Sequence, residues 1–351
     1  DQPRSRGLGD VYKRQDTVTM PSKAMKAFML QAPIGDDVYG EDPTVNALEM
    51  LAAERMGKEA GVFVSSGTMG NLVSGLTHCQ RGDEVLLGTK SHILMYEVAS
   101  LAAFGGVQTR SVPNDAGGLL DPNDIEFAIR PDNDHQPRTG MVAIENTHNR
   151  CSGAVLDTTY IDAIGDLAHR HEAAFHIDGA RIFNAAVALQ TSPSELVRSA
   201  DTVTFCLSKG LSCPVGSIVC GNTETITRVR KNRKMLGGGM RQAGILAAAG
   251  IVALNTMVDR LAEDHETAKR LAKGLSALPG IGLDPETIQT NIVIFEVKDR
   301  SVPELLEGLK SGGVLASCPE QGKIRMVTHY GITAEHIEEA LNVSEDLMRR
   351  P

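Results

Sequence analysis

Short apolar runs alternate with amphipathic stretches along most of the chain. Seven runs have the length and composition of buried strands: "GVFVSS", "DEVLLG", "VQTRSV", "GMVAIEN", "AAFHIDG", "DTVTFCLS" and "GSIVCG". Helical patterns separate several of them, and one begins at Pro43 and ends at Gly57. This alternation predicts an α/β fold whose large domain has a mostly parallel seven-stranded sheet covered by helices on both faces.

The pattern changes in the last third of the chain. There "TNIVIFEV", a helix over "VPELLEGLKSGG", the segment "GKIRMVTHY" and a helix from Thr333 predict a smaller α+β domain. The first fifteen residues, "DQPRSRGLGDVYKRQ", show no period and look foreign to the rest of the chain. We therefore expect an irregular segment over 1–15, a large domain over 16–255 and a small domain over 256–351.

Composition narrows the class of protein. The chain has 351 residues and a net charge of −9, and its densest basic cluster, 228–234, looks like part of one helix, which argues against a nucleic-acid partner. The longest apolar run, "GILAAAGIVAL", is too short to span a bilayer, and no signal-peptide pattern is present, so we expect a cytoplasmic protein without a membrane partner. Six cysteines without a C-x-x-C pair indicate small buried side chains.

Several common motifs fail on inspection. "HEAAFH" is one residue longer than the zinc motif H-E-x-x-H, so its two histidines would not share a helix face. The chain has no phosphate-binding P-loop and no G-x-S-x-G, and the glycines at 237–239 do not follow a strand. We expect no metal site and no ATP, NAD or serine-hydrolase chemistry.

Three features remain, each where a predicted strand ends, and the first two are short turns. In "SSGTMGN", a strand ends at Ser66, Gly67 allows close backbone approach and Thr68 opens a helix whose free N–H groups favour an anion. In "HIDGAR", Asp178 ends a strand and Arg181 follows three residues later. Taken alone, the first feature is more often a simple helix cap, and the second is more often a local salt bridge.

Lys209 is the third feature, because it ends the apolar strand in "TVTFCLSKG". A lysine there could simply extend into solvent, or it could present a reactive amine to a ligand. Together, the phosphate turn, the Asp178 carboxylate and the Lys209 amine match the three anchors of pyridoxal 5′-phosphate. The lysine would form the Schiff base, and the aspartate would hold the protonated pyridine nitrogen.

Longer motifs then point to a family. "DTVTMPS", "GDDVYGEDPTVNALE", "SSGTMGNL", "ENTHN", "HIDGARIFNAAVA", "CLSKGLSCPVGS" and "GGGMRQAGILAAAGI" resemble the low-specificity L-threonine aldolases, from Asp16 to the C-terminus. The resemblance implies the fold-type-I, aspartate-aminotransferase-like class of pyridoxal phosphate enzymes. It implies homodimers or homotetramers with active sites at subunit interfaces. It also implies cleavage of L-threonine and L-allo-threonine, which are β-hydroxy-α-amino acids, to glycine and an aldehyde.

The resemblance also implies residue roles. Lys209 would hold the cofactor, Asp178 would meet the pyridine nitrogen, and His92 in "KSHIL" would stack on the ring near the substrate hydroxyl and act as base. The resemblance assigns the phosphate to Ser66, Gly67 and Thr68, with Arg241 and Lys234 lent by a neighbouring subunit, and the substrate to Arg181, Arg325, His135 and Tyr39. For Lys234 and Tyr39, purely structural roles compete equally.

One departure from the family bears on substrate binding. The family usually begins with Arg-Ser-Asp-Thr-Val-Thr, whose serine helps to hold the substrate carboxylate, and here Gln15 takes its place in "KRQDTVT". We therefore expect weaker carboxylate binding. Two alternatives stay open on the same scaffold: another pyridoxal phosphate reaction, such as β-elimination or transamination, and a protein that binds the cofactor without catalysis.

Overall fold

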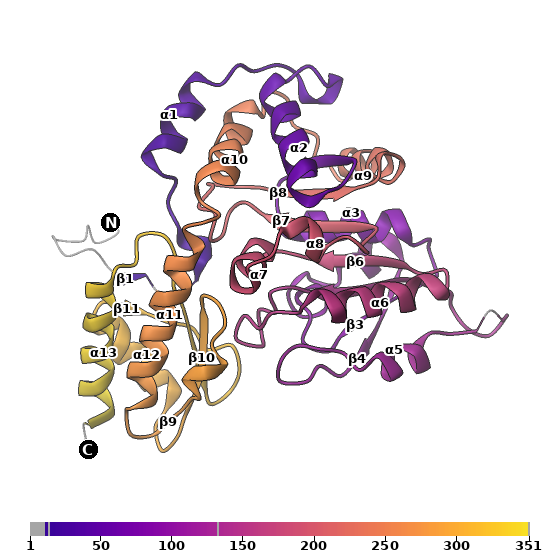
Figure 1. Cartoon of the computed structure of the whole chain (residues 1–351). Coiled ribbons are helices and arrows are strands. Elements are labelled where there is room, and N and C mark those ends of the chain that lie inside the picture. The colour runs from indigo at the N-terminus through magenta and orange to yellow at the C-terminus, as the bar shows by residue number, and fades with distance from the viewer. Residues whose placement is uncertain (1–10, 13–14, 132, 350–351) are drawn as a thin grey trace.

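A seven-stranded sheet forms the centre of the larger part of the molecule in the computed structural model, which describes residues 11–12, 15–131 and 133–349 (Figure 1). Its strands are β2 (Ala60–Val64), β3 (Glu84–Gly88), β4 (Gln108–Val112), β5 (Thr139–Glu145), β6 (Ala174–Asp178), β7 (Thr202–Cys206) and β8 (Ser217–Gly221). Their spatial order is β2-β8-β7-β6-β5-β3-β4. β8 runs antiparallel to β2 and β7, and the other pairs are parallel. The predicted fold class is confirmed, and each predicted strand is present.

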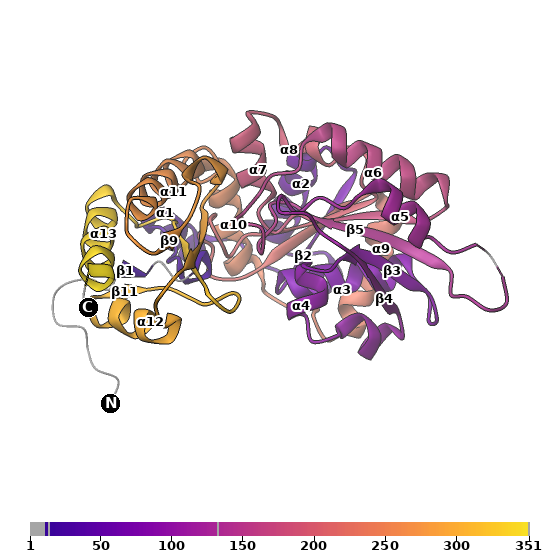
Figure 2. The ribbon, with the colours of Figure 1, turned by 90° about the horizontal axis from the view of Figure 1, so that it is seen from below.

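Both faces of this sheet are covered by helices. Side chains alternate along the strands, so Leu86 and Val142 pack on one face while Val85 and Met141 pack on the other. The first face is covered by α2 (Pro43–Met56), α5 (Pro122–Ala128), α6 (Thr158–Arg170), α7 (Ile182–Leu189), α8 (Pro193–Leu196) and α10 (Gly244–Thr256). The second face is covered by α3 (Gly67–His78), α4 (His92–Tyr96) and α9 (Thr223–Met235). Figure 2 shows α6 and α8 on one side of the sheet and α3 and α4 on the other.

The buried Asp42 fixes the starts of two helices. Its Oδ1 accepts hydrogen bonds from the backbone N of Thr44 at 3.1 Å and Val45 at 3.0 Å, which caps α2. Its Oδ2 accepts from the backbone N of Gly244 at 2.8 Å, at the first residue of α10. α2 ends at Gly57, whose φ of +60° favours glycine, as the sequence predicts.

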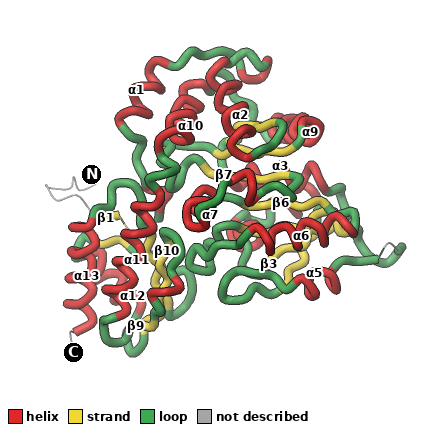
Figure 3. The backbone as a smooth tube through the Cα atoms, in the orientation of Figure 1, coloured by secondary structure: helices red, strands yellow, loops and turns green. Residues whose placement is uncertain are grey.

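The smaller part is an α+β unit with its own apolar core. Its elements are α11 (Leu261–Ser276), β9 (Ile281–Gly282), β10 (Ile292–Val297), α12 (Val302–Ser311), β11 (Val314–Leu315), β12 (Lys323–Val327) and α13 (Ala334–Arg349). The sheet β12-β10-β9 is antiparallel. Figure 3 shows α11, α12 and α13 gathered beside these strands. The predicted small C-terminal α+β domain is confirmed.

Helices α10 and α11 link the two parts. Leu261, at the start of α11, packs in the core of the large part, whereas Ala268 and the residues after it pack in the small core. The predicted boundary at 255/256 falls at the end of α10 and stays a prediction. Over the described ranges, no single helix is long and apolar enough to cross a membrane; only α10 and α11 together reach that length and composition, and they are bent by 72°.

The N-terminal segment contributes to both parts of the molecule. β1 (Val11–Tyr12) pairs in parallel with β11, and α1 (Lys23–Gln31) packs against α10. Val11–Tyr12 form a short strand inside the segment 1–15, which the sequence did not show because a two-residue strand carries no readable period, and the expectation for the segment as a whole stays a prediction. Residues 1–10 and 13–14 lie outside the described residues.

Candidate active site

The carboxyl ends of the parallel strands bring the predicted site residues to one edge of the sheet. Glu145, the last residue of β5, pairs with Asp178, the last residue of β6. Lys209 lies in the loop after β7, the neighbouring strand. Ser66 and His92 follow β2 and β3 at the same edge. Ligand sites of open α/β sheets lie in this position.

Asp178 is buried and held in place by two donors. Its Oδ1 accepts from the backbone N of Ala180 at 3.1 Å, and its Oδ2 accepts from Nδ2 of Asn71 at 2.9 Å. Asn71 lies on α3, the helix that begins next to Ser66. The carboxylate is thus fixed by the strand end and by the helix that starts at the predicted phosphate turn.

The half-buried His92 pairs with the buried Glu97. Its Nδ1 lies 2.9 Å from Oε1 of Glu97, and its backbone N donates to Oε2 of Glu145 at 2.7 Å. The ring centroid of Tyr96 lies 5.3 Å from that of His92. One donor atom from each of His92, Glu97 and Asp178 lies within 4.8 Å of the other two. Three such atoms could also hold a metal ion, which the sequence did not predict.

Burial and the carboxylates around His92 and Glu97 together leave the pKa of both residues raised. Burial opposes a charge on His92, but the hydrogen bond with Glu97 and the negative charges of Asp178 and Glu145 outweigh it, so the pKa of His92 is raised. Burial raises the pKa of Glu97, aided by the charge of Asp178 and opposed by hydrogen bonds with His92 and Asn71. A proton is therefore held readily between His92 and Glu97.

The Lys209 loop is fastened to the N-terminal segment. The backbone O of Lys209 accepts hydrogen bonds from Oγ1 of Thr19 at 2.9 Å and from the backbone N of Ser212 at 2.8 Å. The Lys209 charge also helps to lower the pKa of Asp16, so the amine lies near that carboxylate. The loop that carries the lysine is thus held at a defined place beside the segment that precedes α1.

Arg181 forms a buried bidentate pair with Asp16. Nε of Arg181 donates to Oδ2 of Asp16 at 2.6 Å, and Nη2 donates to Oδ1 at 2.7 Å. Nη2 also donates to Oε1 of Gln15 at 3.0 Å. Burial alone would raise the pKa of Asp16, but the charge and hydrogen bonds of Arg181 hold it well below its usual range. One edge of Arg181 is therefore occupied within the chain.

Arg325 on β12 is a buried guanidinium that makes few contacts within the described part of the chain. Its Nη1 donates to Oδ1 of Asn149 at 3.0 Å, and its buried Nε has no hydrogen-bond partner among the described residues. Burial lowers the pKa of Arg325 to about 10, and the nearby positive charge of Arg181 adds to the effect. A buried cation whose N–H group lacks an acceptor is stabilised when an anion binds to that group.

The predicted phosphate turn is the start of α3. Oγ of Ser66 caps the helix by accepting from the backbone N of Met69 at 3.1 Å. The N–H groups of Gly67 and Thr68 lie in the first turn, where an α-helix offers them no internal acceptor. A Cβ atom at Gly67 would lie 2.9 Å from Sγ of Cys206, so packing against β7 requires glycine there.

Arg241, Tyr39 and Lys234, which were predicted to belong to the site, are exposed on the surface and do not lie at the buried sheet edge. Arg241 forms an ion pair with Asp36 at 2.8 Å, and its backbone O accepts from the N of Asp37 at 3.1 Å. Tyr39 is 74% exposed in the same segment, and Lys234 is exposed at the end of α9. Within one chain, the structure groups these three residues on the surface.

His135 is not brought to this site. It lies in the exposed loop that precedes β5, whereas Glu145 and the site lie at the other end of that strand. A parallel strand separates its two ends by its whole length, so His135 does not reach the carboxyl edge of its own chain. Within one chain, His135 lies away from this edge, and its role in substrate binding stays a prediction.

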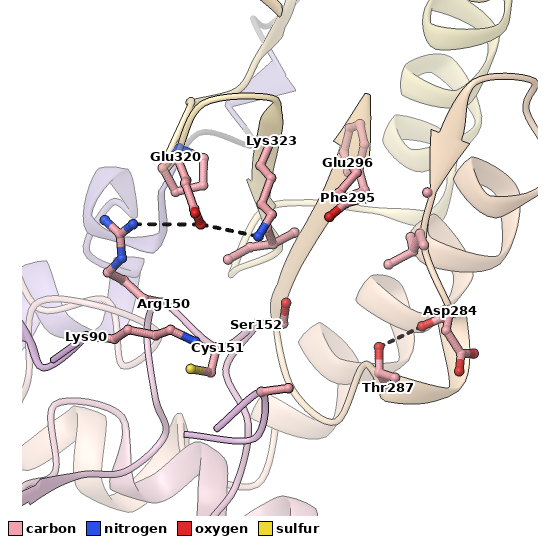
Figure 4. A pocket seen from close by; sticks show the side chains of 15 residues that line it. Lys90, Arg150, Cys151, Ser152, Asp284, Thr287, Phe295, Glu296, Glu320 and Lys323 are labelled. Carbon is pink, nitrogen blue, oxygen red and sulfur yellow. Dashed lines mark hydrogen bonds and ion pairs between the residues drawn. The ribbon is translucent and has the colours of Figure 1, made fainter. Parts of the chain in front are cut away.

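A cleft of about 350 Å³ lies between the loop after β5 and the small part (Figure 4). Figure 4 shows Arg150 and Lys323 on either side of Glu320. Oε2 of Glu320 lies 3.9 Å from Nη2 of Arg150 and 3.2 Å from Nζ of Lys323. Arg150 also donates to Oη of Tyr96 at 2.7 Å. Arg150 therefore connects the wall next to His92 with the small part of the molecule.

Comparison with known proteins agrees with this geometry. The family model for beta-eliminating lyases matches residues 14–298. A probable low-specificity L-threonine aldolase of Arabidopsis thaliana is 44% identical over 340 residues, which are 95% of this chain and 96% of that protein. The chain belongs to the low-specificity L-threonine aldolase family. The family's enzyme in Escherichia coli strain K12 is 43% identical over 93% of this chain and 96% of its own length. A solved threonine aldolase of Leishmania major, 18% identical, has the same fold with a TM-score of 0.82 over 96% of this chain and 99% of that one.

Several polar residues of the site have no role predicted from the sequence. Asp16, Asn71, Glu145 and Asn149 lie inside motifs that carried the resemblance, and that membership was their only signal. Glu97 lies beyond "KSHIL" and had no signal, because its role depends on a helical turn that brings it back to His92.

Proposed function

We propose that the chain cleaves L-threonine and L-allo-threonine to glycine and acetaldehyde, with pyridoxal phosphate bound at Lys209. The observation that carries the proposal is the buried Nε of Arg325, which has no hydrogen-bond partner among the described residues. Arg325 lies near the strand edge because it binds Asn149, whose backbone N donates to Glu145, the residue paired with Asp178. The similarity to low-specificity L-threonine aldolases, at 44% and 43% identity over nearly the whole chain, supports the proposal.

The residues at this edge fit the cofactor. Asp178 offers a fixed, buried carboxylate to a protonated ring nitrogen, and such a charge-assisted bond contributes about 1.5–3 kcal/mol. Lys209 offers an amine, and the start of α3 at Ser66 offers N–H groups to a phosphate. When bound, pyridoxal phosphate supplies an electron sink for charge released at the substrate Cα.

The two arginines divide the work of carboxylate binding. Asp16 occupies the Nε and Nη2 edge of Arg181, so Arg181 is held rigidly in place. Nε of Arg325 has no partner within the described ranges, and burial lowers the pKa of Arg325, so both features favour an anionic partner. Arg325 would bind the substrate carboxylate, with Arg181 as its fixed neighbour, and so orient the Cα–Cβ bond.

His92 is placed to accept the proton of the β-hydroxyl. Because the Glu97 carboxylate binds Nδ1, the neutral imidazole carries its hydrogen there and leaves Nε2 as the acceptor. After His92 takes up a proton, the charges of Glu97, Asp178 and Glu145 stabilise the imidazolium. His92 is therefore the proposed general base.

We propose a homo-oligomer in which Arg241, Lys234 and Tyr39 serve a neighbouring subunit's site. Their common exposed patch supports this role, and so does the apolar surface near α1, where Leu30 is 89% exposed. Mixing inactive Lys209→Ala subunits with inactive Arg241→Ala subunits should restore part of the activity if sites are shared. No recovery in proven mixed oligomers, sized by light scattering, would contradict sharing.

The test of the function is product analysis. Purified protein with pyridoxal phosphate should absorb visible light, and each threonine isomer should give acetaldehyde and glycine in equal amounts. Ammonia with a keto acid would instead indicate β-elimination or transamination. A bound cofactor without turnover of any amino acid would indicate a protein that only binds it.

A further inference from the structure

Asn71 lies between two carboxylates of the proposed site. It is buried on α3, and its Nδ2 donates to Oε1 of Glu97 at 2.8 Å and to Oδ2 of Asp178 at 2.9 Å. Both amide hydrogens are thereby used. One side chain thus connects the partner of His92 with the carboxylate expected to face the pyridine nitrogen.

A buried chain of hydrogen bonds continues behind Asn71. Nε2 of His176 lies 3.1 Å from Oδ1 of Asn71, and Nδ1 of His176 lies 2.8 Å from Oγ1 of Thr202. The same Thr202 oxygen lies 3.0 Å from Nε2 of His78. The chain therefore runs from the site through α3 and β6 to the far end of α3.

With both histidines neutral, one arrangement of hydrogens satisfies this chain. Ionised carboxylates only accept, so the NH₂ group of Asn71 must face them and its Oδ1 must accept from Nε2–H of His176. Nδ1 of His176 must then accept from the hydroxyl of Thr202, which accepts from Nε2–H of His78. Both histidines are neutral in this arrangement, and burial agrees with it because it lowers the pKa of each to about 4.

We propose that Asn71 is a positioning residue that holds Asp178 and Glu97 apart and ionised for the proposed reaction, and that His176 fixes the orientation of its amide. The inference rests on the proposed function, in which Asp178 meets the cofactor and Glu97 orients His92. Without Asn71, the two carboxylates would lose a shared donor in a buried place, where an unpaired charge is costly. The Asp178 carboxylate would then be less firmly fixed and would bind the ring nitrogen less well.

Asn71→Ala is the first variant to measure. We expect the dissociation constant of pyridoxal phosphate to rise roughly 10- to 100-fold, as for lost hydrogen bonds to charged groups. We also expect the pH midpoint of the visible absorption of the bound cofactor to move by about one unit. Ser74→Ala is the matched control, because Ser74 is buried on the same helix and bonds only to the O of Gly70 at 2.8 Å in the described part of the chain. Equal changes in both variants would contradict the proposal.

A second cycle separates positioning from general support of the fold. In an Asp178→Asn background, Asn71→Ala should change the cofactor's dissociation constant by less than about threefold, because coupled residues are not additive. The same loss in both backgrounds would mean that Asn71 acts through the structure alone, and would overturn the proposal.

His176 gives a test that does not disturb Asn71 itself. His176→Gln keeps an N–H donor for Oδ1 of Asn71 and should retain near-normal cofactor binding, whereas His176→Leu should weaken it roughly 10-fold. Equal binding by these two variants would contradict the orienting role, and this pair decides the matter if Asn71→Ala does not fold. A wild-type protein that binds the cofactor but cleaves no threonine would contradict the proposed function alone, because binding and absorption are independent of turnover.

Discussion

Arg181 and Asp16 form a bidentate ion pair inside the protein, with N–O distances of 2.6 Å and 2.7 Å. Both side chains are buried, and the pair joins the N-terminal segment to the start of α7. Because Lys209 is fastened to the same segment through Thr19, this pair holds two walls of the proposed site together.

Asp16→Ala should destabilise the protein strongly. It would leave Arg181 as a buried charge without its carboxylate, which costs about 3 kcal/mol or more in the free energy of unfolding. Urea denaturation measures this change. Glu338→Ala, which breaks the exposed pair with Arg270, is the control and should change the free energy by about 0.5 kcal/mol or less. Similar values for the two variants would contradict the structural role of Asp16.

Lys209→Ala should abolish the visible absorption of bound cofactor and nearly all turnover, because no other amine is proposed to bind it covalently. Lys231→Ala, which removes an exposed lysine of α9, should retain both properties. Absorption spectra and acetaldehyde release measure the two effects. Near-normal cleavage by Lys209→Ala would refute the central assignment.

Arg325→Gln should raise the KM for L-threonine roughly 100-fold, because a charge-assisted contact to the substrate carboxylate is lost. Cofactor absorption should remain, since Arg325 is proposed to touch the substrate and not the cofactor. Steady-state kinetics over a wide range of threonine concentrations measures the change. An unaltered KM would move the carboxylate site elsewhere.

Glu97→Gln should shift the acid limb of the pH profile of kcat/KM to lower pH. Although burial lowers the pKa of His92, Glu97 and the other carboxylates raise it, so removing one charge lowers it again. The base form of His92 would then persist to lower pH, while the loss of orientation should reduce kcat by roughly 10²-fold. The exposed Glu126→Gln is the control. An acid limb that does not move would contradict the pairing of Glu97 with His92.

The stability of the protein should fall as the pH drops from about 6.5 to 4. Burial lowers the pKa of His78 and His176 to about 4 in the folded chain, so over this range the unfolded chain binds protons that the folded chain does not. Each histidine should add a slope of up to about 1.4 kcal/mol per pH unit. Urea denaturation at several pH values should show a shallower slope for His78→Gln than for the exposed His135→Gln. Equal slopes would contradict this origin.

The sequence by itself determined the strands of the large sheet and the residues at their ends. Each of the seven strands was readable because burial on both faces requires an apolar run, which is a local property. Asp178, Lys209 and Ser66 were readable because a parallel sheet gathers its strand ends at one edge. The short β1 was not, because two residues show no period.

Only the tertiary structure decided which polar groups meet. The bond between Arg181 and Asp16 spans 165 positions, and the bond between Asn71 and Asp178 spans 107. Such contacts depend on the order of strands and on the helix that packs beneath them, and neither leaves a repeat in the sequence. His135 illustrates the converse, because within one chain a residue assigned only by resemblance lies at the other end of its strand. Periodicity is local, whereas the pairing of buried charges is set by packing over the whole sheet.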